Sequence, residues 1–491
     1  MNSPVDPTAT AVKPQIIPRS DHTVSRAHIS PNALRVLYRL REGGFQAFLV
    51  GGCVRDLLLG ITPKDFDVAT DALPEEVRKL FRNCRLVGRR FRLAHVFFGR
   101  ETIEVATFRA SSAPSQAEEP IADLDDDETV ATEEGIAEEP VAEPEPEPAG
   151  RRRDSFEQGA DTHRAFDESG RILRDNVYGN IDEDVWRRDF TANSLYYNIA
   201  DFSLWDYVHG AADIASRTLR LIGDPETRYR EDPVRMLRAA RFEAKLEFSL
   251  DAATAAPIAP LAELLGGVPP ARLFDETLKL FLTGHGARSY EVLRRRGLLA
   301  ALLPTVDGYA AAHPGSLVEK LLIQGLRNTD ERVRADKPVT PTFLFALLIY
   351  GPVARIIEAM PPERWHETGA ILDACDQALR EAQTRIAIPR RFSLGVREMF
   401  ALQPRLEHPR GRRALRSLEH PRFRAAYDLL LLRAELGLAS QETAQWWTRL
   451  QTVSGQEQEQ MADELGGSAT PRREGARRGP RRRRRRPASS A

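Results

Sequence analysis

Two short segments near the amino end hold glycines and carboxylates at spacings suited to phosphate chemistry. In LVGGCVRDLLLG, Gly51 and Gly52 stand between an apolar run and a helical pattern. A residue without a Cβ lets a triphosphate approach backbone N–H groups, and the start of a helix favours negative charge. In PKDFDV, Asp65 and Asp67 are two residues apart, so in a strand both carboxylates project from one face. Together the segments predict a nucleotide site with two Mg²⁺ ions, although either segment alone is common in ordinary turns and strands.

A third carboxylate is expected, because two bridged metal ions usually need another anionic ligand. Glu104 in TIEVATF lies mid-strand between apolar residues, where an unpaired charge is costly; its alternative is an edge-strand position facing water. Asp189 in RRDFTAN is the other candidate: Arg187 and Arg188 beside it could neutralise phosphate, while Asp189 and Asn193 could orient a ribose or a metal-bound water. Its alternative is a helix-start aspartate that balances surface arginines. The residues leave open which of the two is the third acid.

A third cluster, REDPVRMLRAARF, has the donors and acceptors to match the edge of a base. On a helix, Asp232, Arg235 and Arg238 are three residues apart and share a face. A carboxylate beside a guanidinium offers both an acceptor and donors to a nucleobase. The alternative is a surface ion pair, usually worth under about 1 kcal/mol, and spacing alone favours that alternative.

The elements that must position these residues follow from apolar periodicity. The patterns predict helices at 32–40, 54–59, 74–81 and 232–245, strands at 45–50, 65–70, 95–98 and 102–108, and further sheet near Val177 and at 195–199. After about Asp213 the pattern is almost entirely helical. This order predicts an α+β fold: a small mixed-sheet head with helices, followed by helical regions.

Charge is distributed very unevenly along the chain. The net charge of −1 conceals fourteen Asp and Glu between Arg109 and Arg151, and ten Arg against one Glu from Pro471 onward. The acidic stretch cannot bury enough apolar surface to order itself, so it predicts a disordered insertion. Consecutive arginines bind phosphate without reading sequence, so the tail predicts RNA contact, with a merely solubilising tail as the alternative. The run consists of Arg481, Arg482, Arg483, Arg484, Arg485 and Arg486.

Size and composition limit the class further. A chain of 491 residues is too long for one hydrophobic core and predicts two to four packed units. No apolar run approaches the roughly 20 residues that span a bilayer, and the polar, Pro-rich start does not match a secretory signal. Three widely spaced cysteines fit neither a disulfide framework nor a metal site. We therefore expect a cytoplasmic protein without a transmembrane segment.

Taken together, the motifs resemble those of the class II nucleotidyltransferases, the group that includes bacterial poly(A) polymerases and CCA-adding enzymes. The matching segments are LVGGCVRDLLLG, PKDFDVAT, IEVATF, RRDFTANSLYYN and REDPVRMLRAARF. The resemblance implies Mg²⁺ at Asp65 and Asp67, a catalytic contribution from the RRDF segment, and base recognition by Asp232 and Arg235. It also implies head, neck, body and C-terminal RNA-binding regions. Within the class, LVGRRFRLAHVFF and the Arg-rich end resemble the poly(A) polymerases, whereas the acidic insertion is longer than their pattern.

The resemblance gives a predicted domain order and reaction. The predicted regions are a disordered leader at 1–28, a catalytic head at 29–110 and 166–212, the acidic insertion at 111–165, a neck and body at 213–300, an RNA-binding region at 301–460, and a disordered tail at 461–491. The expected activity is addition of AMP from ATP to RNA 3′ ends with release of pyrophosphate, promoting mRNA turnover. Gly51, Gly52 and Arg55 would seat the triphosphate, Mg²⁺ or Mn²⁺ would serve as the metal, and the protein would act as a monomer, in contact with RNA-decay machinery.

Two rival functions remain at this stage. A CCA-adding enzyme would share the motifs but would use CTP as well as ATP and stop after three additions. A non-catalytic RNA-binding adaptor would keep the fold, but intact Asp65, Asp67 and Asp189 argue against it.

Overall fold

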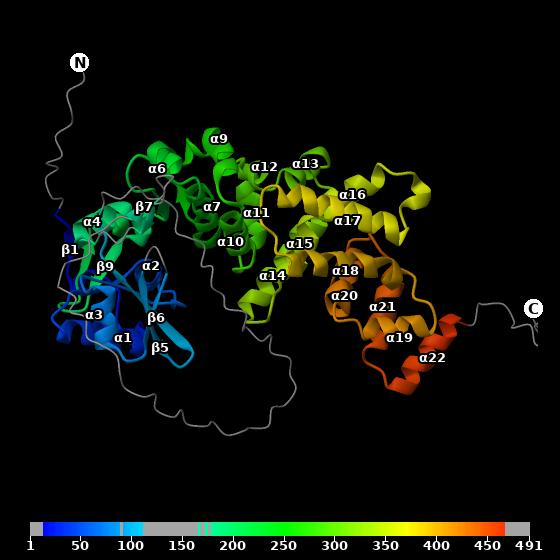
Figure 1. Ribbon diagram of the computed structural model, residues 1–491, viewed down its shortest axis with the longest axis horizontal. Coiled ribbons are helices and arrows are strands. Elements are labelled where there is room, and N and C mark those ends of the chain that lie inside the picture. The colour runs from blue at the N-terminus through cyan, green and yellow to red at the C-terminus, as the bar shows by residue number, and fades with distance from the viewer. Residues whose placement is uncertain (1–12, 89–91, 111–164, 167–171, 175–177, 467–491) are drawn as a thin grey trace, which may run out of the picture. The chain divides into compact units, whose positions relative to one another are not determined.

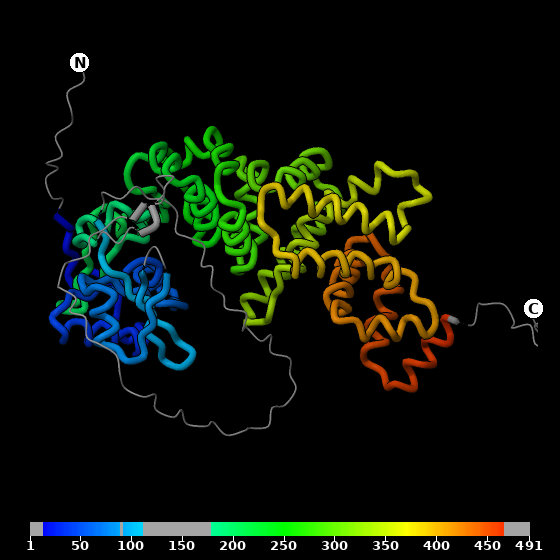
Figure 2. Tube along the Cα trace, in the orientation of Figure 1, coloured from blue at the N-terminus to red at the C-terminus, as the bar shows by residue number. Residues whose placement is uncertain are grey.

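The computed structural model describes residues 13–88, 92–110, 165–166, 172–174 and 178–466, drawn in colour in Figure 2. The chain divides into two compact units, one formed by Met1–Pro352 and Gln377–Phe392, the other by Val353–Asp376 and Ser393–Ala491. The acidic insertion predicted at 111–165 and the six arginines at 481–486 lie outside the described residues, apart from Ala165. The domain limits given above stay predictions.

An eight-stranded sheet organises the amino-terminal part of the first unit, in the order β1-β10-β9-β2-β3-β6-β5-β4 (Figure 1). All neighbours in it are antiparallel except β3 and β6. Two short two-stranded sheets pair β7 with β8 and β11 with β12. The strands are β1 Gln15–Ile17, β2 Ala47–Val50, β3 Asp67–Thr70, β4 Cys84–Val87, β5 Leu93–Phe98, β6 Glu101–Thr107, β7 Ala165–Phe166, β8 Ile172–Arg174, β9 Leu195–Asn198, β10 Leu204–Asp206, β11 Thr218–Leu219 and β12 Ser249–Leu250.

Strand β2 lies inside the sheet and is buried along its whole length, which explains its continuous apolar sequence AFLV. Phe48 and Val50 face a core cluster that includes Val185 of the helix α4, Ile181–Arg187. Helix α1, Pro31–Glu42, begins where Ser30 accepts a hydrogen bond from the Asn32 N–H, and it contacts β2, β3 and β6. The sheet therefore has helices packed against it, and its central strands are buried between neighbours.

Helices make up nearly all the rest of the described chain. Those of the first part of the chain are α2 Gly52–Leu58, α3 Pro74–Leu80, α5 Gly210–Ala215, α6 Pro225–Glu231, α7 Val234–Leu246, α8 Ala252–Ala255, α9 Ile258–Leu261, α10 Pro270–Phe281, α11 Gly286–Arg295, α12 Leu298–Leu302, α13 Pro304–Ala312, α14 Leu317–Arg334 and α15 Pro341–Leu348. Those that follow are α16 Tyr350–Glu358, α17 Thr368–Gln383, α18 Arg390–Glu407, α19 Arg412–Leu418, α20 Phe423–Glu435, α21 Gln441–Leu450 and α22 Gly455–Gly466. The predicted α+β class is confirmed.

The second unit has its own core. Trp447 is fully buried there, and its indole N–H donates to the Leu406 carbonyl oxygen at 2.7 Å. The ring centroids of Phe423 and Trp447 lie 5.4 Å apart.

Among the described residues, one stretch, Pro341–Glu358, is long and apolar enough to cross a membrane. Of this stretch, 61% is buried inside the fold, as in the core helix of a helical domain.

Three details of the sequence prediction need correction. The strand predicted at 65–70 begins only at Asp67, because the chain is still turning at Lys64. The helix predicted at 232–245 begins at Val234: Asp232 precedes a proline, which disfavours helical backbone, and it is extended with φ −146°. Strands β1, β4 and β10 were missed, and they are only three or four residues long.

Candidate nucleotide site

One cavity of about 1010 Å³ in the first unit brings together segments that are far apart in the sequence. Every predicted site residue between 51 and 238 lines it except Glu104: these are Gly51, Gly52, Arg55, Asp65, Asp67, Arg188, Asp189, Asn193, Asp232, Arg235 and Arg238. Basic side chains outnumber acidic ones along its wall, as expected for a cavity that receives a polyanion.

The glycine turn leads from β2 into helix α2 and lies beside the first residue of the acidic strand. Gly51 has φ +82°, a conformation that L side chains rarely adopt, and it turns the chain into α2. A Cβ on Gly51 would lie 3.7 Å from the Asp67 Oδ2, so the missing side chain keeps this corner open. Helix α2 spans only seven residues, so its dipole adds little, and the cavity's basic side chains must supply most of the attraction for phosphate.

Asp65 and Asp67 reach the same cavity by a different route from the one predicted. Asp67 is the first residue of β3, pairs with Val50 across the sheet, and has Glu104 of β6 as its parallel neighbour. Asp65 is exposed in the loop before the strand, whereas Phe66 between them is buried. The alternation of exposed and buried side chains that was predicted for a strand therefore starts at Asp65, in the loop two residues before β3.

Negative charge is concentrated around Asp67. Burial and the charge of Glu104, with a smaller contribution from Asp65, raise the pKa of Asp67 to about 6. Glu104 lies beside it on β6, which is an interior strand, so the predicted edge position does not hold. Its side chain does face water, as that alternative expected: it is 49% exposed and lies 3.6 Å from the His95 Nε2. A divalent cation would relieve this charge, and carboxylates are the ligands that Mg²⁺ prefers.

The described residues contain no group of three or more His, Cys, Asp or Glu side chains gathered as a ready metal site. Asp65 and Asp67 both line the cavity and offer the oxygen ligands that Mg²⁺ prefers, so these residues fit the metal that the resemblance implies.

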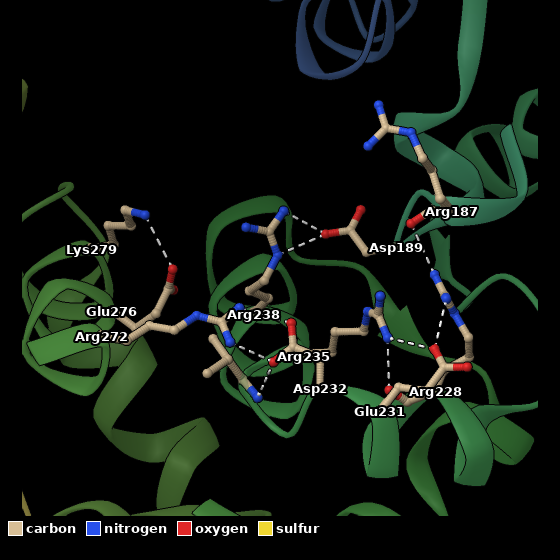
Figure 3. Close-up of polar contacts among 11 residues, drawn as sticks. Arg187, Asp189, Arg228, Glu231, Asp232, Arg235, Arg238, Arg272, Glu276 and Lys279 are labelled. Atoms are coloured by element: carbon tan, nitrogen blue, oxygen red, sulfur yellow. Dashed lines mark hydrogen bonds and ion pairs between the residues drawn. The ribbon is translucent and has the colours of Figure 1, made fainter. Parts of the chain in front are cut away.

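Asp189, the rival third acid, is already committed to a partner. Its Oδ2 accepts hydrogen bonds from the Nε of Arg238 at 2.8 Å and from a terminal nitrogen of Arg238 at 2.6 Å (Figure 3). Burial alone would raise the pKa of Asp189, but Arg238 outweighs it and holds that pKa below the usual range. Asp189 thus joins the segment after α4 to helix α7, while Glu104 is the carboxylate beside Asp67.

Arg55 and Asn193 form a bridge under the glycine turn. The Arg55 side chain is 2% exposed and donates to the Asn193 Oδ1 at 2.5 Å and to the Asp56 Oδ1 at 2.6 and 2.8 Å. Its guanidinium also lies 5.7 Å from the ring centroid of Phe242 on α7. With these contacts made inside the protein, Arg55 supports the turn more than it presents charge to a ligand.

The two arginines before Asp189 share one buried carboxylate. Asp184, on α4, accepts from Arg187 at 2.6 Å, from Arg188 at 2.8 Å and from the Tyr196 hydroxyl at 2.8 Å. Burial opposes its ionisation, but the two arginines and the tyrosine hold the pKa of Asp184 well below its usual value. This carboxylate fixes the arginines at the cavity wall.

Helix α6 holds the same segment from the other side. A terminal nitrogen of Arg228 donates to the carbonyl oxygens of Arg187 at 3.0 Å and Arg188 at 2.7 Å, as Figure 3 shows for Arg187. Burial and the neighbouring Arg235 lower the pKa of Arg228. Its hydrogen bonds to backbone oxygens therefore offset the free-energy cost of burying a charged guanidinium beside another cation.

The predicted base-reading residues are held by partners that sequence spacing did not reveal. Both carboxylate oxygens of Asp232 accept from Arg272 of α10, each at 2.8 Å (Figure 3). Arg235 donates to the Arg228 carbonyl oxygen at 2.8 Å and to Glu231 at 3.2 Å. The alternative of a surface ion pair within one helix face is therefore wrong: Asp232, in the extended link before α7, forms a buried pair with Arg272 of α10, and the two side chains are 8% and 11% exposed.

Several cavity residues were missed in the sequence: Lys64, Arg109, Lys245, Arg272, His285 and Arg334. Lys64 adjoins the predicted Asp65 and could have been found by position. The others belong to segments whose approach to the cavity depends on helix packing, for which the sequence carries no local signal.

Comparison with known proteins accounts for most of the chain. Three family models match in order: the poly(A) polymerase head domain at 47–220, a probable RNA and SrmB-binding site of polymerase A at 247–309, and the polymerase A arginine-rich C-terminus at 363–488. Poly(A) polymerase I of Salmonella typhi is 46% identical over 93% of this chain and 90% of its own. The CCA-adding enzyme of Lactobacillus helveticus is 32% identical over 53% of this chain and 52% of its own.

Solved structures agree on the fold. The Thermotoga maritima CCA-adding enzyme complexed with tRNA superposes with a TM-score of 0.51 over 94% of this chain and 97% of its own, at 17% identity. The fold is that of the class II nucleotidyltransferases. Because the match to poly(A) polymerase I extends over nearly the whole chain, the chain belongs to the bacterial poly(A) polymerase I family.

Proposed function

We propose that this chain adds AMP from ATP to RNA 3′ ends without a template, releasing pyrophosphate. The carrying observation is the single cavity in which the glycine turn, the acidic strand, the RRDF segment and the Asp232–Arg235 pair meet. Similarity to poly(A) polymerase I over almost the whole chain favours this activity over CCA addition, since the similarity to a CCA-adding enzyme covers about half. A non-catalytic adaptor would have no use for an open acidic corner beside a phosphate-binding turn.

In this proposal, Asp65 and Asp67 hold Mg²⁺, with Glu104 as the third carboxylate. Metal ions bound there would activate the RNA 3′-hydroxyl and stabilise the departing pyrophosphate, with Mn²⁺ as a possible substitute. The backbone at Gly51 and Gly52 leaves room for the triphosphate.

The basic and polar residues provide positioning and charge neutralisation. Arg188, held by Asp184 and Tyr196, is aimed from the cavity wall at phosphate. Asp232 and Arg235 read adenine by accepting from its exocyclic amine and donating to a ring nitrogen. Since the substrates bring the reacting groups, catalysis consists of orientation and electrostatic stabilisation with no covalent enzyme intermediate.

Location and partners complete the proposal. We place the protein in the cytoplasm; its three cysteines, Cys53, Cys84 and Cys375, are all free, as in a reducing compartment. It would act as a monomer, with Arg481–Arg486 adding sequence-independent RNA contact and with the RNA-decay machinery as a partner that consumes its product.

The test is primer extension on a short RNA with ATP, CTP, GTP and UTP supplied separately with Mg²⁺. The expected result is a long ladder with ATP alone, at least about a hundredfold weaker in Asp67→Asn, because that variant removes a metal-binding carboxylate. Glu42→Gln, which removes an exposed carboxylate at the end of α1, is the charge-matched control and should extend normally. Addition that stops after CTP and ATP on a tRNA end would replace this proposal with CCA addition.

A further inference from the structure

One face of α7 forms a continuous wall of the cavity. Arg235, Arg238, Phe242 and Lys245 are spaced three, four and three residues apart, so they project from the same side of the helix, and all four line the cavity. Arg235 and Arg238 bind Glu231 and Asp189, and Phe242 packs on Phe190 with ring centroids 5.5 Å apart. Lys245, at the far end, differs from them: within the part of the chain that the structure describes, it has no hydrogen-bond or ion-pair partner.

Lys245 is surrounded by other cations. Partial burial in the cavity, together with the charges of Arg55, Arg241 and Lys64, lowers the pKa of Lys245, and Asp56 only partly opposes this. Burial and the charges of Lys245 and Arg334 likewise lower the pKa of His285 against the opposing charge of Asp330. Like charges gathered in a cavity repel one another unless an anion enters between them.

The carboxylates near this end are mostly engaged elsewhere. Asp56 binds Arg55, and Asp330 accepts from the Gly286 N–H at 2.6 Å and the Ala287 N–H at 3.0 Å. Asp336 also lines the cavity, and its single charge does not balance the cations around Lys245. The protein leaves this end of the cavity positive.

We propose that Lys64, Lys245, His285 and Arg334 form a subsite for the phosphodiester groups of the RNA immediately before its 3′ end. This rests on the proposed function. The incoming nucleotide has its own place, with its base at Asp232 and Arg235 and its phosphates near Gly51. Lys245 is ten residues from Arg235 on α7, about 15 Å along the helix, too far to serve the same base.

Position and chemistry both favour RNA as the occupant. Lys64 directly precedes Asp65, so the subsite adjoins the carboxylates where the RNA 3′-hydroxyl must react. Ammonium groups neutralise phosphate as point charges and do not distinguish one base from another. This suits an RNA 3′ end that the protein must bind again after every addition. Consecutive phosphates along one stacked strand are about 3.4 Å apart. A subsite that adjoins the carboxylates would therefore contact one of the last few phosphodiester linkages before the RNA 3′ end.

Binding of a 5′-labelled oligoadenylate across a salt series tests the subsite. Lys245→Met should weaken binding about fivefold at low salt and reduce the salt slope by about 0.7, the share of one phosphate contact on a single strand. Lys245→Arg should restore most of the affinity. Lys320→Met is the matched control, since Lys320 is exposed on α14 and does not line the cavity; it should bind as the unaltered chain does. Unchanged RNA binding in Lys245→Met, or a raised KM for ATP with RNA binding intact, would overturn the proposal, the latter in favour of the triphosphate.

Primers with one neutral methylphosphonate linkage locate the contact. The unaltered chain should lose affinity when one of the linkages nearest the 3′ end is neutral, and Lys245→Met should show no further loss at that linkage. Equal losses in both proteins would refute a contact with Lys245. The unmodified primer separates this proposal from the broader one. An unaltered chain that adds no AMP to the unmodified primer would refute the enzymatic function, whereas normal addition to it, with binding unaffected by the neutral linkages, would refute only the subsite.

Discussion

Replacing Arg272 by methionine should loosen base recognition without touching the base. Arg272 holds both oxygens of Asp232 at 2.8 Å, and the two side chains are only 11% and 8% exposed. Removing one partner of a buried ion pair costs about 3–5 kcal/mol because it strands a buried charge. Since the cavity gives water some access to Asp232, we expect the lower end, about 3 kcal/mol.

The consequence for catalysis follows from the loss of orientation. A carboxylate held by two parallel hydrogen bonds presents its remaining lone pairs in fixed directions. Once released, the Asp232 side chain can turn to accept from the amine of cytosine as readily as from that of adenine. We expect the preference for ATP over CTP, as a ratio of kcat/KM values, to fall about tenfold, equivalent to about 1.4 kcal/mol.

The assay combines steady-state single-nucleotide addition with chemical unfolding of four proteins: the unaltered chain, Arg272→Met, Asp232→Asn and the double variant. A double-mutant cycle isolates the pair, because the stranded charge is absent from the double variant. Arg288→Met is the control, since its pair with Glu247 is exposed and worth about 1 kcal/mol at most. Equal losses of ATP and CTP use, or a coupling energy near zero, would refute the reasoning.

Three further perturbations test the rest of the site. Gly51→Ala should cost about 1–2 kcal/mol of stability from its φ of +82° and also abolish most AMP addition, whereas Gly44→Ala, with φ +87° and open space around it, should show only the stability cost in thermal unfolding. Arg228→Met should lower kcat more than it raises the KM for RNA, because it frees the carbonyls of the RRDF segment; unchanged kinetics would exclude that support. Asp184, whose folded pKa is depressed, contributes stability at pH above about 3.9 that is lost as pH falls through its folded pKa. The Tm deficit of Asp184→Asn should therefore be constant from pH 7 to 5 and shrink below pH 4, and a deficit independent of pH would contradict this.

The sequence predicted most of what depends on local pattern. The apolar run of β2, the glycine turn after it and the helical spacing of α1 and α7 all follow from neighbouring residues, and the structure has each of them. The boundaries at Asp67 and Val234 were misplaced because a local turn and a proline override the alternation and the helical spacing. The role of each site residue stays a prediction.

The partners of the site residues were beyond prediction for a physical reason. Asp232 and Arg272 are 40 residues apart, and Asp189 and Arg238 are 49 apart, so only the packing of helices brings them together. Their spacing carries no period that a single sequence could reveal. The sequence predicted the type of residue needed at each position of the site. It could not predict which oppositely charged side chain forms an ion pair with that residue.

Helix α7 explains how the residues proposed to read the base and the carboxylates at Asp67 keep a fixed separation. Arg238 is tied to Asp189 by two hydrogen bonds, and Phe242 contacts both the Phe190 ring and the buried guanidinium of Arg55. Arg55 in turn supports the turn beside Asp67. The residues proposed for base recognition, the glycine turn and the acidic corner are thus joined through one helix face, whose side chains are packed and paired. Adding the same nucleotide repeatedly requires this fixed separation, since without a template the shape of the cavity alone must choose the base.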